Sequence, residues 1–212
     1  MKILDLSHNI SPDMPVYPGT EPPVISNEYG IEDDGFYERK ITLYSHTGTH
    51  MDAPAHIIQG SETLDEFTTE SFFGKAFVLE LTQLKKQLID VADLKSHQDT
   101  LKNLEFLLLH TGWSRFWGTK KYFKDYPVLS GEAAQWLKTF HLKGIGLDTI
   151  SADRADSKDF PIHKVFLKNH TLIIENLTNL DTIPSKTFLF SCFPLKFANA
   201  DGSPVRAVAI IE

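Results

Sequence analysis

Short apolar runs separated by polar turns recur along much of the chain. These runs predict strands at residues 76–81, 105–112, 144–150, 171–177, 187–192 and 205–211. Several are apolar at almost every position, which is typical of strands buried on both faces of a sheet. An alternating run over residues 38–48, with Ile, Thr and Tyr, predicts a further strand that leads into the segment that follows it.

Helical periodicity is confined to fewer segments. Residues 130–141 begin at Ser130, a helix-capping residue type, and their apolar positions fall on one helix face: Ala133, Trp136, Leu137 and Phe140. Weaker patterns predict helices over residues 90–98 and 159–170. Strands outnumber helices but alternate with them in the second half, which predicts an α/β fold around a mixed, partly parallel sheet.

Domain organisation is simple. Five of the eleven prolines lie in residues 11–26, which predicts an ordered loop because proline removes backbone donors and favours extended neighbours. No repeat or low-complexity linker divides the 212 residues, so we expect one domain over residues 1–212.

Composition narrows the class of protein. Hydrophobic residues make up 42% and charged residues 23%, as in ordinary globular proteins, and the formal net charge is -7. Negative charge argues against nucleic-acid and anionic-membrane partners, which favour a basic face. The N-terminus lacks the long apolar run of a signal peptide, and the lone Cys192 can form no intramolecular disulfide. We therefore expect a cytoplasmic protein.

Several side chains that can bind a metal ion lie close together in residues 45–56, SHTGTHMDAPAH, the metal-capable stretch. Glycine, threonine and proline disfavour a helix here. In an extended chain, His46, His50, Asp52 and His56 would all project to one side because they occupy even positions. The odd positions are small or apolar and suit packing, so idle surface histidines are the less favoured alternative.

A straight strand could not use these groups together. His46 and His50 would lie roughly 13 Å apart at about 3.3 Å per residue, whereas ligand nitrogens lie about 2.1 Å from a metal ion. The chain must therefore bend, and Gly48 is the residue best able to allow it. Imidazole and carboxylate ligands without thiolate suit Zn²⁺, Mn²⁺ or Fe²⁺ and exclude a Cys-rich structural zinc site.

The same stretch resembles the signature of the cyclase-like metal-dependent hydrolases, which include bacterial kynurenine formamidase and isatin hydrolase. The likeness extends through MPVYPG, LLLHTGWS, GIGLDTISAD, PIHKVFLKNHTLIIENL and PLKFANADGSPVRAVAI. This resemblance implies a compact, barrel-like mixed sheet with flanking helices, assembled as a homodimer or homotetramer. It also implies one or two divalent ions per chain, with Zn²⁺ first and Mn²⁺ next.

The resemblance further implies a ligand set. His46, His50 and Asp52 would hold one ion, and Asp52 would bridge to a second ion. The remaining ligands of that second ion would be His163 and Glu175, neither of which stands out from the residues alone.

Other site residues follow from the same resemblance. His56 would be the general acid and base. Tyr17 would contact the substrate, and Trp113 would border the pocket, although a partly buried core aromatic is an equally good interpretation of Trp113. Asp201 and Arg206 are expected to form a turn and a structural ion pair.

The reaction implied is hydrolysis of the carbon–nitrogen bond of a small amide other than a peptide. Metal ions would activate a water molecule, and His56 would donate a proton to the leaving nitrogen. The first substrate candidate is N-formylkynurenine, an aryl formamide of tryptophan catabolism. Tyr17 stands where kynurenine formamidases tend to carry Trp, so a cyclic amide such as isatin, or a lactone, stays open. A metal-dependent lyase or dehydratase and a non-catalytic metal-binding protein are the alternatives from other classes.

Overall fold

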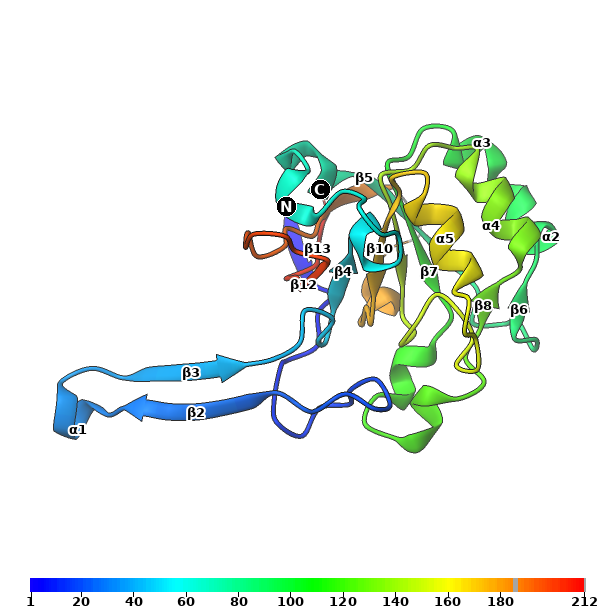
Figure 1. The fold of residues 1–212 in the computed structure, drawn as a ribbon. Coiled ribbons are helices and arrows are strands. Elements are labelled where there is room, and N and C mark those ends of the chain that lie inside the picture. The colour runs from blue at the N-terminus through cyan, green and yellow to red at the C-terminus, as the bar shows by residue number, and fades with distance from the viewer. Residues whose placement is uncertain (185–186, 212) are drawn as a thin grey trace.

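A computed structural model describes residues 1–184 and 187–211. Nine strands form one curled sheet in the order β1-β13-β11-β5-β7-β9-β10-β4-β12 (Figure 1). Their bounds are β1 Lys2–Asp5, β4 His50–Asp52, β5 Phe73–Glu80, β7 Phe106–His110, β9 Gly144–Leu147, β10 Leu172–Glu175, β11 Phe188–Ser191, β12 Gly202–Pro204 and β13 Val208–Ile211. The predicted mixed, barrel-like sheet is confirmed.

The centre of the sheet is parallel. Strands β5, β7, β9 and β10 run in one direction, whereas the strands at both sides pair antiparallel. Every residue of β7, β9 and β10 is buried, as the continuous apolar runs predict. Side chains alternate between two cores, so that Leu107 faces one and Leu108 the other. The carboxyl ends of these strands share one edge, which is where parallel sheets commonly place their sites.

Helices cover one face of the sheet (Figure 1). They are α2 Val91–Leu94, α3 Gln98–Leu101, α4 Gly131–Lys138 and α5 Pro161–Leu167. The Ser130 hydroxyl accepts a bond from the Ala133 N–H at 3.0 Å and caps α4, as predicted. The helix expected over residues 90–98 is instead broken into α2, the 3₁₀ turn η4 (Lys95–His97) and α3.

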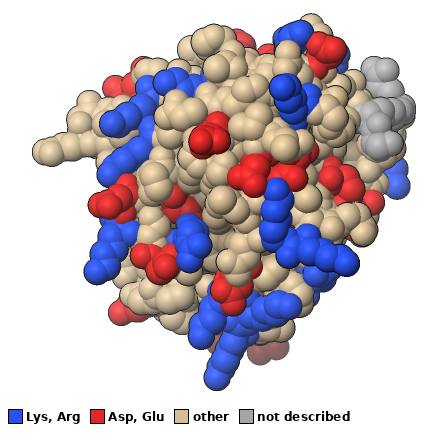
Figure 2. All heavy atoms as spheres, turned by 90° about the vertical axis from the view of Figure 1, so that its right-hand side faces the viewer, with Lys and Arg blue, Asp and Glu red and all other residues tan. Residues whose placement is uncertain are grey.

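The outer surface of this face carries both charge signs. Lys and Arg are interspersed with Asp and Glu over it (Figure 2). Within the described ranges, no helix combines the length and the apolar character needed to cross a membrane.

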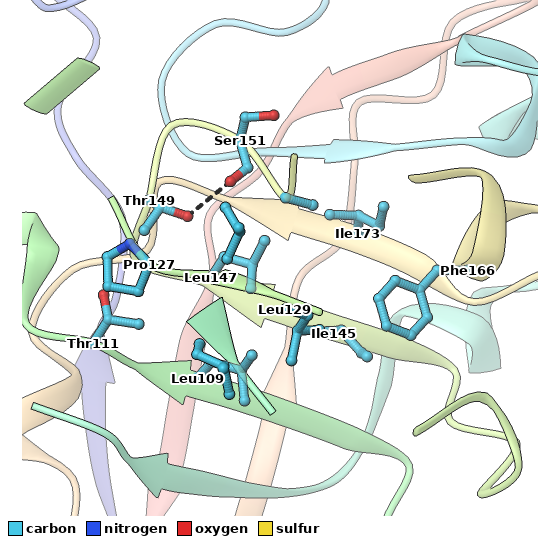
Figure 3. Close-up of a pocket in the computed structure, with 13 residues that line it drawn as sticks. Leu109, Thr111, Pro127, Leu129, Ile145, Leu147, Thr149, Ser151, Phe166 and Ile173 are labelled. Carbon is cyan, nitrogen blue, oxygen red and sulfur yellow. Dashed lines mark hydrogen bonds between the residues drawn. The ribbon is translucent and has the colours of Figure 1, made fainter. Parts of the chain in front are cut away.

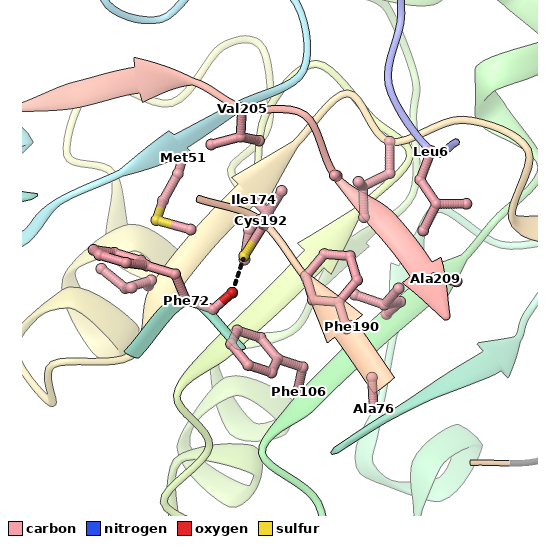
Figure 4. Close-up of a cluster of buried hydrophobic side chains, with 14 of the residues drawn as sticks. Leu6, Met51, Phe72, Ala76, Phe106, Ile174, Phe190, Cys192, Val205 and Ala209 are labelled. Atoms are coloured by element: carbon pink, nitrogen blue, oxygen red, sulfur yellow. Dashed lines mark hydrogen bonds between the residues drawn. The ribbon is translucent and has the colours of Figure 1, made fainter. Parts of the chain in front are cut away.

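The second face curls around its own core (Figure 4). Leu6, Met51, Phe106 and Phe190 are fully buried there, contributed by segments from both ends and the middle of the chain. Cys192 lies among them and its thiol donates to the Phe72 carbonyl at 3.6 Å. Burial raises the pKa of this thiol, so Cys192 has the character of a packing residue.

A β-hairpin projects from the body (Figure 1). It consists of β2 Val24–Tyr29 and β3 Glu38–Thr42, joined through α1 Ile31–Asp34, and all residues of these elements are exposed or only partly buried. The strand predicted over residues 38–48 therefore ends at Thr42 and does not lead into the metal-capable stretch. Alternation reports local strand propensity, but it does not say which sheet the strand joins. A separate two-stranded sheet pairs β6 Leu88–Ile89 with β8 Val128–Leu129.

Candidate metal centre and active site

The metal-capable stretch bends at Gly48, as the sequence predicts. Gly48 has φ +67°, and a side chain there would press on Met14 at 3.3 Å. Only His50–Asp52 is extended, as β4, which lies between β10 and β12. The chain then turns through the 3₁₀ helix η1, Pro54–His56, so His56 reaches the site from a turn and not from a continued strand.

The alternate residues of the stretch pack inward, as expected. Thr47, Thr49, Met51 and Ala53 are all buried. Their packing anchors β4 in the sheet, so the polar side chains on the opposite side of the strand occupy defined positions.

His46, His50 and Asp52 form the first group of candidate ligands. Oδ1 of Asp52 lies 2.7 Å from His46 Nδ1 and 3.3 Å from His50 Nε2. The candidate ligand atoms of all three residues lie within 4.8 Å of one another, close enough to surround one ion.

Asp52, His163 and Glu175 form the second group. His163 Nε2 lies 3.3 Å from Glu175 Oε1 and 3.6 Å from Asp52 Oδ2. His163 comes from α5, whereas Glu175 ends β10 directly opposite His50 on β4. The two groups therefore meet at Asp52, with one carboxylate oxygen facing each.

Each histidine has an acceptor for the ring nitrogen that points away from its group. Asp201 Oδ2 lies 3.0 Å from His46 Nε2, and the Gly48 carbonyl lies 2.9 Å from His50 Nδ1. Asp153 Oδ2 lies 2.6 Å from His163 Nδ1. Such partners hold the proton on the outer nitrogen and leave the inner nitrogen free for a metal.

The pKa values of the candidate ligands indicate that positive charge on the imidazoles balances the buried carboxylates. Burial alone lowers the pKa of His46, but bonds to Asp201 and Asp52 raise it to about 10. The pKa of His163 is also raised, against its burial, by Asp153, Asp52 and Glu175. Burial opposes ionisation of Asp52, yet the surrounding histidines hold its pKa well below the usual range. Protons on the imidazoles thus balance carboxylates that a divalent cation would balance instead.

Two further features fit a bound cation. Oδ2 of Asp52 is buried and has no hydrogen-bond partner among the described residues, although buried carboxylate oxygens are normally paired. Gly202 on β12 faces His46 so closely that a Cβ there would overlap the ring. The imidazole and carboxylate set therefore fits a divalent ion of the zinc or manganese type.

The Cyclase family model matches residues 4–154. The chain belongs to the cyclase family. The kynurenine formamidase of Geobacillus thermodenitrificans is 31% identical over 206 residues, which cover 96% of this chain and 95% of that protein. The predicted family is confirmed.

Solved structures agree with this assignment. Isatin hydrolase A from Ralstonia solanacearum superposes with a TM-score of 0.86 at 26% identity, over 100% of this chain and 92% of that one. A potential metal-dependent hydrolase with cyclase activity superposes with a TM-score of 0.80 at 26% identity, over 98% and 96% of the two chains. The chain is thus a metal-dependent hydrolase by family, and the predicted enzyme class agrees with relatives that act on carbon–nitrogen bonds other than peptide bonds.

His56 of this cyclase-family chain lies beside the ligand groups. Its ring centroid is 3.9 Å from that of His46, and its Nδ1 is 3.8 Å from Asp201 Oδ2. Its side chain is 32% exposed, whereas those of His50, Asp52 and Glu175 are almost fully buried. Burial chiefly lowers the pKa of His56, to about 4, so the imidazole is neutral near pH 7.

Sequence reasoning missed Asp201 and Asp153. The expected ion pair between Asp201 and Arg206 is wrong, because Arg206 Nη2 pairs with Asp5 Oδ2 at 2.6 Å while Asp201 turns toward His46. Asp201 contacts a histidine 155 positions away, and no local pattern signals such a pair. Asp153 precedes His163 by ten residues across a loop, so its role also depends on how that loop folds.

The two aromatic residues expected near the substrate differ in their surroundings. Trp113 is 9% exposed and its indole N–H donates to the Tyr122 carbonyl at 3.0 Å, so it packs within an aromatic cluster. Tyr17 is 39% exposed in the proline-rich loop. Tyr17 lies near enough to Tyr126 to add to the factors, chiefly burial, that raise the pKa of that phenol.

The solvent-exposed residues of the candidate centre lie close together. The space between the sheet and α5, lined by Ile145, Phe166 and Ile173 among others (Figure 3), measures about 10 Å³. That volume holds roughly one water molecule and no substrate. The exposed parts of the centre belong to His46, His56 and Asp201, so a substrate would approach from their side.

Proposed function

We propose that this chain hydrolyses the carbon–nitrogen bond of a small amide, with an aryl formamide such as N-formylkynurenine as the first candidate. The observation that carries the proposal is the meeting of two ligand groups at Asp52, to which the first group adds His46 and His50 and the second adds His163 and Glu175. The kynurenine formamidase similarity supports the formamide. The isatin hydrolase similarity supports a cyclic amide as the second candidate, with a lactone next.

The ligand groups would hold one or two divalent ions per chain, Zn²⁺ first and Mn²⁺ next. His46, His50 and Asp52 would hold one, and Asp52, His163 and Glu175 the other. A bound divalent ion supplies a water molecule of lowered pKa and polarises a carbonyl group. The buried carboxylates and the outer hydrogen bonds of the histidines orient these residues beforehand.

His56 is the residue of this chain placed to move protons. As a neutral imidazole beside the centre, it would accept a proton from the attacking water and return it to the leaving nitrogen. Asp201, near its Nδ1, would orient the ring. Tyr17 would stack against an aromatic substrate ring, and Trp113 would support the pocket wall from behind.

The projecting hairpin supports assembly as a homodimer or homotetramer. Ile31, Phe36, Tyr37 and Ile41 are each half exposed or more on this arm. An isolated two-stranded hairpin is marginally stable in water, so a second copy of the chain would cover it. Size-exclusion chromatography with light scattering tests this, and a monomer at micromolar concentration would contradict it.

Activity screening tests the substrate class. The protein, loaded separately with Zn²⁺ and Mn²⁺, is assayed in ¹⁸O-labelled water with N-formylkynurenine, isatin, simple lactones and, for the dehydratase alternative, small hydroxy acids. We expect ¹⁸O in the formate released from the formamide, or in the acid formed from isatin. Elimination of water from a hydroxy acid, without label in the product, would favour a dehydratase and contradict the proposal.

The lone buried Cys192 fits the reducing cytoplasm, where we place the protein.

A further inference from the structure

Asn176 connects the two ligand groups through its backbone. It follows Glu175 directly and has a left-handed φ of 59°, a conformation that asparagine tolerates better than most residues. Its N–H donates to the Thr149 carbonyl at 3.0 Å. Its carbonyl accepts from the Thr49 hydroxyl at 2.7 Å. The end of β10 is thereby tied to the residue that precedes His50.

The side chain of Asn176 reaches the bend at Gly48. Its Nδ2 donates to the Gly48 carbonyl at 2.8 Å, and the same carbonyl lies 2.9 Å from His50 Nδ1. A carbonyl oxygen can only accept, so the nitrogen of His50 that faces it must carry the proton. With the proton on Nδ1 held by this carbonyl, His50 Nε2, which lies 3.3 Å from Asp52 Oδ1 and 3.5 Å from Glu175 Oε2, is the nitrogen that a metal ion would bind.

Tyr122 settles which way the Asn176 amide points. Its hydroxyl lies 2.7 Å from Asn176 Oδ1, and both side chains are buried. Burial raises the pKa of Tyr122 well above its usual range, so the phenol keeps its proton and donates. If the amide were reversed, its oxygen would face the Gly48 carbonyl, an unfavourable contact between two acceptors.

We propose that Tyr122 and Asn176 are positioning residues that hold the Gly48 carbonyl in place and so set the tautomer and orientation of His50 as a metal ligand. The chain of contacts runs from the Tyr122 hydroxyl through the Asn176 amide and the Gly48 carbonyl to His50 Nδ1. It links the aromatic cluster around Trp113 to the ligand groups. The proposal rests on the proposed function only for its effect on metal binding, because the contacts from Tyr122 to His50 Nδ1 are made within the chain itself.

Two substitutions test the chain of contacts. Tyr122→Phe removes the hydroxyl and keeps the ring, and Asn176→Gly removes the amide while allowing the left-handed backbone. Long-range ¹H–¹⁵N NMR of the metal-free protein, with labelled histidine, reports whether Nδ1 of His50 carries a proton and how fast that proton exchanges. We expect an Nδ1–H signal that is protected from exchange with solvent in the wild type, and loss of that protection in both variants. Zn²⁺ affinity, measured by chelator competition, should fall by about 10–100-fold in Asn176→Gly and by about 10-fold in Tyr122→Phe.

Matched controls separate positioning from packing. Tyr126→Phe removes another buried hydroxyl of the same cluster, one that bonds the Asp153 carbonyl. Asn179→Gly removes another left-handed asparagine whose amide bonds a carbonyl, that of Asp5. Both controls should leave the His50 signal unchanged.

A folded Tyr122→Phe protein with the wild-type His50 signal would overturn the proposal, whatever the outcome for Asn176→Gly. A wild-type protein that shows the Nδ1–H form but binds no Zn²⁺ would instead contradict the proposed function and leave the positioning role standing.

Discussion

Asp153 Oδ2 lies 2.6 Å from His163 Nδ1 and also accepts the backbone N–H of His163 at 3.1 Å. One carboxylate therefore fixes both the ring and the first turn of the helix that carries it. This arrangement gives a first prediction. Asp153→Asn keeps the shape but loses the charge, and it should lower the affinity of the second ligand group about 10–100-fold. Metal content per chain, measured by elemental analysis, checks it.

The control for Asp153→Asn is Asp156→Asn, because Asp156 is an exposed carboxylate that pairs with Arg154. It should keep the wild-type metal content. Equal metal loss in both variants would mean that metal affinity depends on the net negative charge of the loop and not on the contact with His163.

Glu175→Gln should selectively weaken the second ligand group. Glu175 Oε1 lies 3.3 Å from His163 Nε2, and an amide there supplies no negative charge to a cation. We expect fewer ions per chain and a lower rate, with the first group still occupied. Elemental analysis and kinetics on one preparation check it, and wild-type values for both would exclude Glu175 as a ligand.

His56→Ala should separate metal binding from proton transfer. Proton transfer by a positioned side chain is typically worth about 10²–10⁴-fold, so kcat should fall by that range while metal content stays near wild type. His50→Ala should lose metal and activity together, because His50 is buried between the two carboxylates. If His56→Ala strips the metal as completely as His50→Ala, His56 is a ligand and another group transfers the proton.

Gly202→Ala should disturb the first ligand group although no ligand residue is replaced. The added methyl would overlap the ring of His46, which would have to shift from its present position. Metal affinity should fall by at least about 10-fold, by analogy with the loss of an orienting contact. Gly131→Ala is the control, since a Cβ at Gly131 meets open space. Unchanged affinity in Gly202→Ala would show that β12 can shift to make room.

Metal affinity should rise with pH. The pKa of His46 is raised to about 10 in the metal-free protein, so below that pH binding must displace a proton. Affinity should therefore increase between about pH 6.5 and 8, by at most about tenfold per pH unit for each proton displaced. Calorimetry in buffers of different ionisation enthalpy counts the protons released.

Asp201→Asn removes one of the two carboxylates that raise the pKa of His46 and should flatten this dependence. An affinity that does not change with pH in the wild type would contradict the proton balance described for the site.

The sequence alone determined the features that depend on local pattern. Continuous apolar runs predicted the central strands, because strands buried on both faces admit few polar residues, and β7, β9 and β10 follow this rule. The shared parity of His50 and Asp52, with Gly48 as the bend, predicted a curled metal-capable strand. His163 and Glu175 could be named only through family resemblance.

Tertiary structure alone decided the partners that lie far apart along the chain. The alternating run ending at Thr42 joins a projecting hairpin, because strand propensity does not specify the neighbouring strand. Asp201 turns to His46 across 155 positions, and Tyr122 reaches Asn176 across 54. Such contacts depend on how loops from separate strands meet at one edge of the sheet. A hydrogen bond formed there produces no periodic pattern in the sequence, so the sequence alone does not predict it.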